Sequence, residues 1–174
     1  MRRAVFLDRD GVVNRTEVRG GRPFAPTRIE DFEIISGVPK AVERLKSAGF
    51  MVFVVTNQPD IETGLQTVDS LAEMHDKMLA AAAIDDVFVC PHTDAANCDC
   101  RKPKPGMLLA AAKKHDVALD RSWMIGDRWR DIEAGAAAGC RTVFVDRGYD
   151  EPLPKADHIV AEMPEALPFI LADN

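Results

Sequence analysis

Five short apolar runs recur along the chain, and none of them shows the polar alternation of a half-exposed strand. The runs are rich in Val, Ile and Phe and occupy residues 4–7, 51–55, 87–89, 123–125 and 142–145. Continuous apolar runs of this length are typical of strands that are buried on both faces. We therefore expect a sheet of such strands that is covered on both sides.

Helix signals fall between these runs, in amphipathic or alanine-rich stretches. The residues that favour helix ends there are Pro39, Thr67 and Pro105 near a start, and Gly49 and Gly139 after an end. Strands that alternate with helices predict an α/β fold with a doubly wound, Rossmann-like parallel sheet. In such sheets ligands bind beyond the carboxyl ends of the strands.

The length and the one long irregular segment predict a simple organisation. A chain of 174 residues can bury one apolar core, so we assign residues 1–174 to a single domain. The irregular segment, residues 9–36, contains Gly20, Gly21 and Pro23. We interpret it as a short flap that cannot bury a core of its own. We therefore expect no large cap domain and a pocket that is open to small substrates.

Composition and charge narrow the class of partner. Apolar residues make up 47% of the chain and charged residues 29%, a balance typical of globular proteins. The formal net charge of −6 argues against broad attraction to nucleic acid or to an anionic membrane. Only residues 4–7 separate Arg2 and Arg3 from Asp8, too few for a signal peptide, and no later run approaches the roughly 20 residues of a membrane helix. We expect a monomeric cytoplasmic protein that acts on a small phosphorylated metabolite.

Two carboxylates follow the first apolar run. Asp8 and Asp10 stand at positions i and i+2, which face the same side of an extended chain. Cleavage of a phosphate ester needs a nucleophile and a proton for the leaving oxygen, and this pair can supply both. Gly11 lets the backbone turn and present N–H groups to phosphate oxygens. The alternative for this motif alone is an ordinary strand end that runs into an acidic turn.

Further polar residues stand at the ends of the other apolar runs. They are Thr56 and Asn57, Lys102, Gly126 and Asp127, and Asp131 four residues later. In order and spacing, this set and the Asp-x-Asp-Gly motif resemble the haloacid dehalogenase superfamily of phosphatases. The resemblance covers most of the chain.

The resemblance implies a role for each of these residues. Asp8 would be the nucleophile and Asp10 the general acid and base. Thr56, Asn57 and Lys102 would hold the transferring phosphoryl group, with Gly11 in the substrate-binding loop.

A catalytic Mg²⁺ is also implied, bound by Asp8, Asp127 and the backbone carbonyl of Asp10. The assignment is chemically sensible, because Mg²⁺ prefers oxygen ligands and shields an anionic phosphate from the attacking carboxylate. Asp131 has two interpretations. It orients Lys102 or a metal-bound water, or it is a first-turn residue favoured by the helix dipole.

Three of the four cysteines lie close to a histidine in the sequence. Cys90 and His92 form one pair and Cys98 and Cys100 a second, each with one residue between its members. Disulfides are not expected in the cytoplasm, and four such ligands can close a tetrahedral site. We predict a structural Zn²⁺, because four protein ligands leave no position open for substrate.

The alternative for this cluster is a set of unpaired thiols with a loop histidine. That is our interpretation of the remaining candidates, Cys140, His75, His115 and His158. A zinc site would fix Arg101 and Lys102, which follow Cys100 directly, for contact with phosphate. We expect loss of zinc to lower activity by misplacing these two cations.

The zinc loop carries a second, narrower resemblance. Residues 90–92 and 98–107, Cys-Pro-His and Cys-Asp-Cys-Arg-Lys-Pro-Lys-Pro-Gly-Met, closely resemble the D-glycero-D-manno-heptose 1,7-bisphosphate phosphatases. This resemblance implies removal of the C7 phosphate of a sugar bisphosphate on the route to lipopolysaccharide or other surface heptose. Arg101 and Arg128 would help to bind the substrate. Histidinol-phosphate phosphatases share much of the pattern, so histidinol phosphate or another small sugar phosphate is the alternative substrate.

Other classes of protein fit the sequence less well. A phospho-accepting receiver domain is also doubly wound, but its acceptor follows the third strand, where this chain has Cys90. A nucleotide-binding protein would need a glycine-rich phosphate loop, and neither common motif occurs. A phosphomutase or phosphotransferase would share the aspartyl intermediate, so release of phosphate without an added acceptor is the test that separates it.

Overall fold

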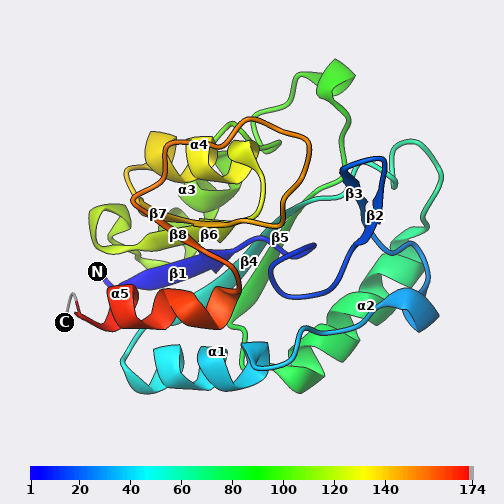
Figure 1. Cartoon of the computed structure of the whole chain (residues 1–174). Helices are drawn as coiled ribbons and strands as arrows, with labels where there is room; N and C mark the ends of the chain where they lie inside the picture. The colour runs from blue at the N-terminus through cyan, green and yellow to red at the C-terminus, as the bar shows by residue number, and fades with distance from the viewer. Residues whose placement is uncertain (173–174) are drawn as a thin grey trace.

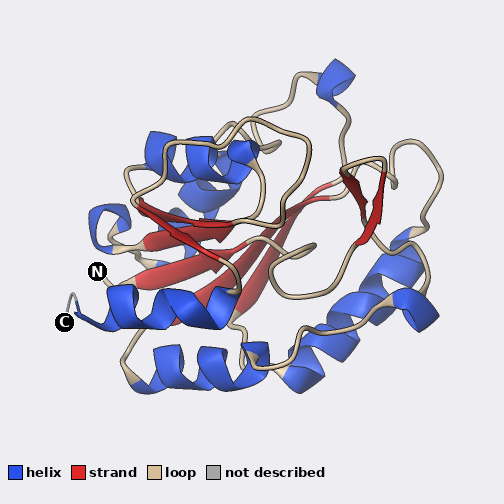
Figure 2. Cartoon of the chain, viewed as in Figure 1, coloured by secondary structure: helices blue, strands red, loops and turns tan. Residues whose placement is uncertain are grey.

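The fold is a parallel sheet between two layers of helices. The computed structural model describes residues 1–172. A six-stranded sheet lies between the helices (Figures 1 and 2), and all its pairings are parallel. In order across the sheet its strands are β5 (Asp86–Cys90), β4 (Met51–Asn57), β1 (Ala4–Leu7), β6 (Trp123–Gly126), β7 (Arg141–Val145) and β8 (His158–Val160). The predicted fold class is confirmed.

Side chains of the central strand alternate between two apolar cores. Val5 and Leu7 pack with α1 (Val38–Ser47), α2 (Val68–Ala81) and α5 (Leu167–Ala172) on one face. On the other face, Ala4 and Phe6 pack with α3 (Gly106–His115) and α4 (Trp129–Ala138). Because neighbouring residues of a strand point to opposite faces, a wholly apolar strand fits only between two helical layers.

The predicted strands and helix ends are found, with small shifts. Strands β4, β5 and β6 extend past their apolar runs and end at Asn57, Cys90 and Gly126. At the start of α2 the backbone N–H of Ser70 donates to the Thr67 side chain at 3.1 Å. Helices α1 and α4 end at left-handed glycines, and Pro105 caps the start of α3.

One strand of the sheet, β8, was not predicted from the sequence. Strand β8 has three residues, and its central Ile159 is half exposed. A run this short carries no clear pattern, and β8 joins the sheet by parallel pairing with β7.

The segment predicted as a flap contains a hairpin that was not predicted. Strands β2 (Glu17–Arg19) and β3 (Arg22–Phe24) pair antiparallel beyond the carboxyl ends of β1 and β4 (Figure 1). Within residues 1–172 no segment forms a large cap over this edge. In the same part of the chain, no helix is long and apolar enough to cross a membrane.

Candidate active site

The carboxyl ends of the strands surround a pocket of about 290 Å³. It is lined by residues from the flap, the strand ends and the loops that follow them: Asp8, Asp10, Thr16, Pro23, Phe24, Ala25, Asn57, Gln58, Pro59, Asp60, Arg101, Lys102, Asp127, Arg128, Arg130 and Asp131. Most of the predicted site residues are therefore brought together. Apart from the proposed zinc ligands, the predicted site residues absent from this lining are Gly11 and the fully buried Thr56.

Lys102 is buried at the floor of this pocket. Its ammonium group donates to Asp8 Oδ1 at 2.7 Å and to the backbone oxygen of Val55 at 2.8 Å, and it pairs with Asp131 Oδ1 at 2.6 Å. Burial alone would lower the pKa of Lys102, but the Asp131 and Asp8 carboxylates outweigh burial and raise it. Lys102 is therefore a fixed cation beside Asp8.

Three carboxylates lie close together here, and two of them, Asp8 and Asp131, pair with the Lys102 ammonium. Asp8, Asp127 and Asp131 each place an oxygen within 4.8 Å of the others. Burial and the neighbouring Asp131 raise the pKa of Asp8 to about 7, and burial with Asp8 raises the pKa of Asp127 as well. The buried Asp127 Oδ1 has no hydrogen-bond partner. The cluster has more negative charge than Lys102 neutralises, and its oxygen donors fit Mg²⁺.

Asp131 has contacts that fit both interpretations of its sequence position, as a residue that orients Lys102 and as a first-turn helix residue. Its Oδ1 pairs with Lys102, which supports an orienting role. Its Oδ2 accepts the backbone N–H of Arg128 at 3.0 Å, in the first turn of α4. One buried carboxylate thus caps a helix and holds the ammonium in place.

The backbone at Gly11 has little room for any other residue. Its φ is +84°, and an added Cβ would lie 1.8 Å from Asp127 Oδ2. This close approach explains why glycine follows Asp10.

Thr56 and Asn57 hold neighbouring groups in place. The Thr56 hydroxyl is buried and accepts from Gln58 Nε2 at 2.8 Å. The Asn57 side chain exchanges two hydrogen bonds of 3.1 Å with the backbone of Lys102. Asn57 therefore fixes the chain from which Lys102 projects.

The zinc-loop residues also come together, on the pocket side of the sheet. Ligand atoms of Cys90, His92, Cys98 and Cys100 all lie within 4.8 Å of one another. All the cysteines are free thiols, and the Cys90 and Cys100 sulfurs are 2.9 Å apart. The predicted set thus has the compactness that one metal ion requires.

Known proteins that resemble this chain place it in a family. A D-glycero-β-D-manno-heptose-1,7-bisphosphate 7-phosphatase of Neisseria meningitidis is 38% identical over 83% of this chain and 77% of its own. The enzyme of the same name from Pseudomonas putida is 37% identical over 84% of each chain. This chain belongs to that family.

Comparisons of structure agree with the heptose-bisphosphate phosphatase family. A D,D-heptose 1,7-bisphosphate phosphatase of B. bronchiseptica, solved with magnesium and phosphate, has a TM-score of 0.85 at 30% identity and covers 99% of both chains. A second such phosphatase, from Burkholderia thailandensis, has a TM-score of 0.69 at 30% identity, with 97% and 99% covered. Residues 99–166 also match the family described as HAD-hydrolase-like.

In this member of the family, acidic partners that the sequence analysis missed hold the rim arginines. Asp94 of the zinc loop accepts from Arg101 Nε at 2.9 Å and from Arg130 Nη1 at 2.7 Å. Arg128 donates to Glu151, with Nε at 2.7 Å from Oε2. Such pairs join separate loops, and no spacing in the sequence indicates them.

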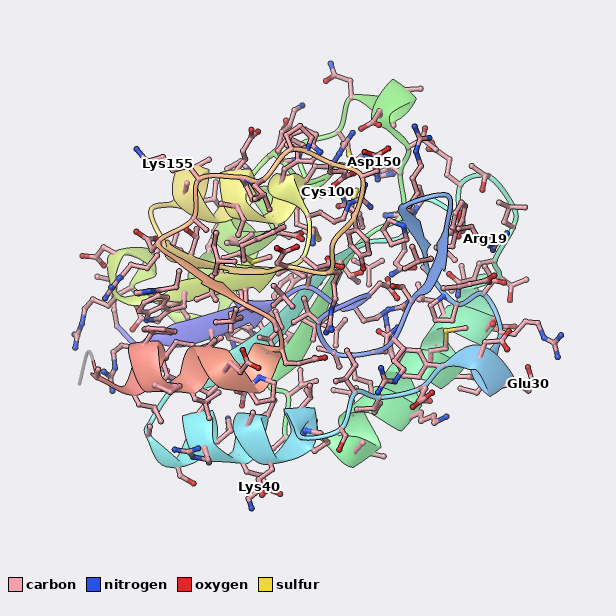
Figure 3. The ribbon with its side chains drawn as sticks, in the orientation of Figure 1. Arg19, Glu30, Lys40, Cys100, Asp150 and Lys155 are labelled. Carbon is pink, nitrogen blue, oxygen red and sulfur yellow. The ribbon has the colours of Figure 1, made fainter. Side chains whose placement is uncertain are left out.

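Tyr149 is another residue that the sequence analysis missed. Its hydroxyl donates to Asp127 Oδ2 at 2.8 Å and contacts Thr16 Oγ1 at 3.2 Å. The neighbouring Asp150 donates its backbone N–H to Gly21 O at 2.8 Å, at the hairpin tip. Figure 3 shows the loop of Asp150 and the hairpin of Arg19 on the same side of the molecule. The flap is thereby tied to a predicted metal ligand.

Proposed function

We propose that this chain is a Mg²⁺-dependent phosphatase that removes the C7 phosphate of D-glycero-D-manno-heptose 1,7-bisphosphate through an aspartyl-phosphate on Asp8. The observation that carries the proposal is the buried cluster of Asp8, Lys102, Asp127 and Asp131 at the pocket floor. The choice of substrate rests on the names of the relatives. The residues fit the chemistry, because a carboxylate can approach a phosphate dianion only beside fixed positive charge.

Asp8 and Asp10 share the two half-reactions. Asp8 attacks phosphorus, the bond from phosphorus to the sugar oxygen breaks, and Asp10 passes a proton to that oxygen. Water then attacks the phosphorus of the aspartyl-phosphate while Asp10 takes a proton from it, and Asp8 leaves as a carboxylate with release of phosphate. Arg9 lowers the pKa of Asp10 although burial opposes this, so Asp10 rests as an anion. The resting anion takes its first proton from solvent, and the proton that Asp10 removes from water in the second half-reaction returns it to the acid form for the next substrate.

Asp8, Asp127 and the backbone carbonyl of Asp10 would hold Mg²⁺, which neutralises phosphate charge and orients the phosphoryl group. Lys102, which donates to Asp8 Oδ1, supplies further positive charge. Asn57 keeps Lys102 in position through its backbone hydrogen bonds.

The rim of the pocket suits a substrate with a second anionic group. Arg101, Arg128 and Arg130 line the pocket, as does the hairpin residue Phe24. Each of these arginines is already oriented by a carboxylate, which reduces the entropy lost when a ligand is bound. A sugar bisphosphate matches a pocket that is acidic at its floor and basic at its rim.

The partners and location of the enzyme follow from the same proposal. We infer a monomer that acts on a small cytoplasmic metabolite and does not use nucleic acid or a membrane surface. The net charge of −6 and the free thiols support this, because free cysteines suit a reducing compartment.

A structural Zn²⁺ bound by Cys90, His92, Cys98 and Cys100 is part of the proposal. The bound metal would hold the loop that presents Arg101 and Lys102. Removing zinc from the folded protein with a chelator, followed by return of Mg²⁺ alone, should lower kcat/KM by about 10-fold or more, in line with the cost of losing support for a site. Metal analysis measures the zinc content, and phosphate release measures the turnover of the same sample. Full turnover of folded, zinc-free protein would contradict this role.

A phosphate-release screen tests the proposed substrate. The panel contains both anomers of the heptose bisphosphate, histidinol phosphate and nucleoside monophosphates, each with and without Mg²⁺. We expect the highest kcat/KM for a heptose bisphosphate, strict dependence on Mg²⁺, and no need for an added acceptor. A preference for histidinol phosphate would show that the proposed substrate is wrong and would leave the proposed aspartyl-phosphate chemistry in place. Failure to hydrolyse any phosphate ester would refute the proposed function.

A further inference from the structure

Arg9 is a buried cation for which the proposed reaction has no direct use. It stands between the two catalytic aspartates, yet its side chain is 0% exposed. Its guanidinium lies 5.4 Å from the centre of the Phe32 ring. Burying a guanidinium costs free energy unless its donors are paired, so the pairing of Arg9 indicates what it does.

Two residues take the donors of Arg9. Its Nη2 and Nε donate to Asp10 Oδ1, at 2.8 and 3.2 Å. Its Nη1 lies 3.3 Å from Nε2 of His75 on α2. Burial and the charge of Arg9 lower the pKa of His75 to about 4, so the imidazole is neutral near pH 7 and its Nε2 accepts from Arg9. His75 therefore fixes the rotation of the guanidinium.

The two oxygens of Asp10 are bonded unequally. Oδ1 receives both Arg9 donors and Asn14 Nδ2 at 3.0 Å. Oδ2 receives only Gln58 Nε2, at 2.8 Å. A carboxylate oxygen can accept more than one hydrogen bond, so Oδ2 keeps capacity for a substrate oxygen or water in the pocket.

We propose that Arg9, oriented by His75, is a positioning residue that anchors Asp10 through Oδ1 and leaves Oδ2 to transfer the proton. The inference rests on the proposed function, in which Asp10 is the general acid and base. It assigns a role to His75, a helix residue whose position in the sequence gives no sign of a function. It also explains why a full positive charge is buried beside the nucleophile.

This role predicts a dependence on the leaving group. A sugar alkoxide needs a proton as it departs, whereas p-nitrophenolate departs as a stable anion. Loss of Asp10 positioning should therefore slow transfer to Asp8 from a sugar phosphate and spare transfer from p-nitrophenyl phosphate. Attack of water on the aspartyl-phosphate needs Asp10 with both substrates.

The test compares His75→Phe, which removes the acceptor, with His75→Gln, whose side-chain oxygen can replace Nε2. For His75→Phe we expect kcat/KM with heptose bisphosphate to fall about 10-fold, while kcat/KM with p-nitrophenyl phosphate changes less than about 3-fold. The variant should also release a burst of p-nitrophenolate equal to the enzyme, because hydrolysis of the aspartyl-phosphate becomes limiting. His75→Gln should retain the wild-type ratio of the two substrates.

Arg9→Lys gives an independent comparison, because lysine keeps the charge but lacks the fork that joins Asp10 to His75. We expect kcat/KM with heptose bisphosphate to fall about 100-fold, again with little change for p-nitrophenyl phosphate. Thermal melting checks that the variant is folded. If His75→Phe and Arg9→Lys both keep the wild-type ratio of kcat/KM for the two substrates, whether or not kcat/KM itself falls, the positioning role is wrong. Wild-type protein that hydrolyses neither substrate would instead refute the proposed function.

Discussion

Replacing Asp8 by Asn should lower turnover by at least about 10⁴-fold without unfolding the protein. The amide has the shape of the carboxylate but cannot attack phosphorus. The fold should survive, because Lys102 still pairs with Asp131 and the removed charge relieves repulsion within the acidic cluster. Phosphate release measures turnover, and thermal melting measures folding.

A second carboxylate of the same pocket provides the control. Asp60 lines the pocket, and burial raises its pKa, but it lies outside the Lys102 cluster. Asp60→Asn should therefore retain activity within about 10-fold. Activity of Asp8→Asn close to that of Asp60→Asn would show that Asp8 is not the nucleophile.

Replacing Lys102 by Met should destabilise the metal-free protein by about 3–5 kcal/mol and abolish measurable turnover. The substitution leaves Asp8, Asp127 and Asp131 buried together without the ammonium that pairs with Asp8 and Asp131. Urea denaturation in the presence of a chelator measures the loss of stability. Added Mg²⁺ should restore part of it, because the cation binds the folded state.

The loss of stability should depend on pH in a defined direction. The pKa of Asp8 in the folded protein is already raised from 3.8 to about 7. A raised carboxyl pKa means that the folded state holds the proton more tightly, so stability falls as pH rises through that window. Lys102→Met raises the carboxyl pKa values further, so its destabilisation should be larger at about pH 8 than at about pH 5.

Lys104→Met is the matched control for this substitution. Lys104 lies two residues further on, has a side chain that is 43% exposed, and pairs with Asp99 and Asn97. Its replacement should change stability by less than about 0.5 kcal/mol. Wild-type stability of metal-free Lys102→Met would show that the buried carboxylates are not held together by this ammonium.

The sequence by itself determined the features that depend on local patterns. Continuous apolar runs identified five of the six strands of the parallel sheet, because a strand buried on both faces has no polar positions. Thr67 and Gly139 marked helix ends, because caps act on neighbouring backbone groups. The ordered motifs predicted which polar residues meet at the pocket, since the ends of parallel strands share one edge.

Only the tertiary structure decided how those residues are paired. Lys102 reaches Asp8 across 94 positions of sequence, and Tyr149 reaches Asp127 from a loop with no motif. His75 belongs to no motif in the sequence, and packing of α2 brings it to the guanidinium of Arg9. Such pairings depend on how separate elements pack, whereas patterning and capping act over a few residues, so only the latter can be predicted from sequence.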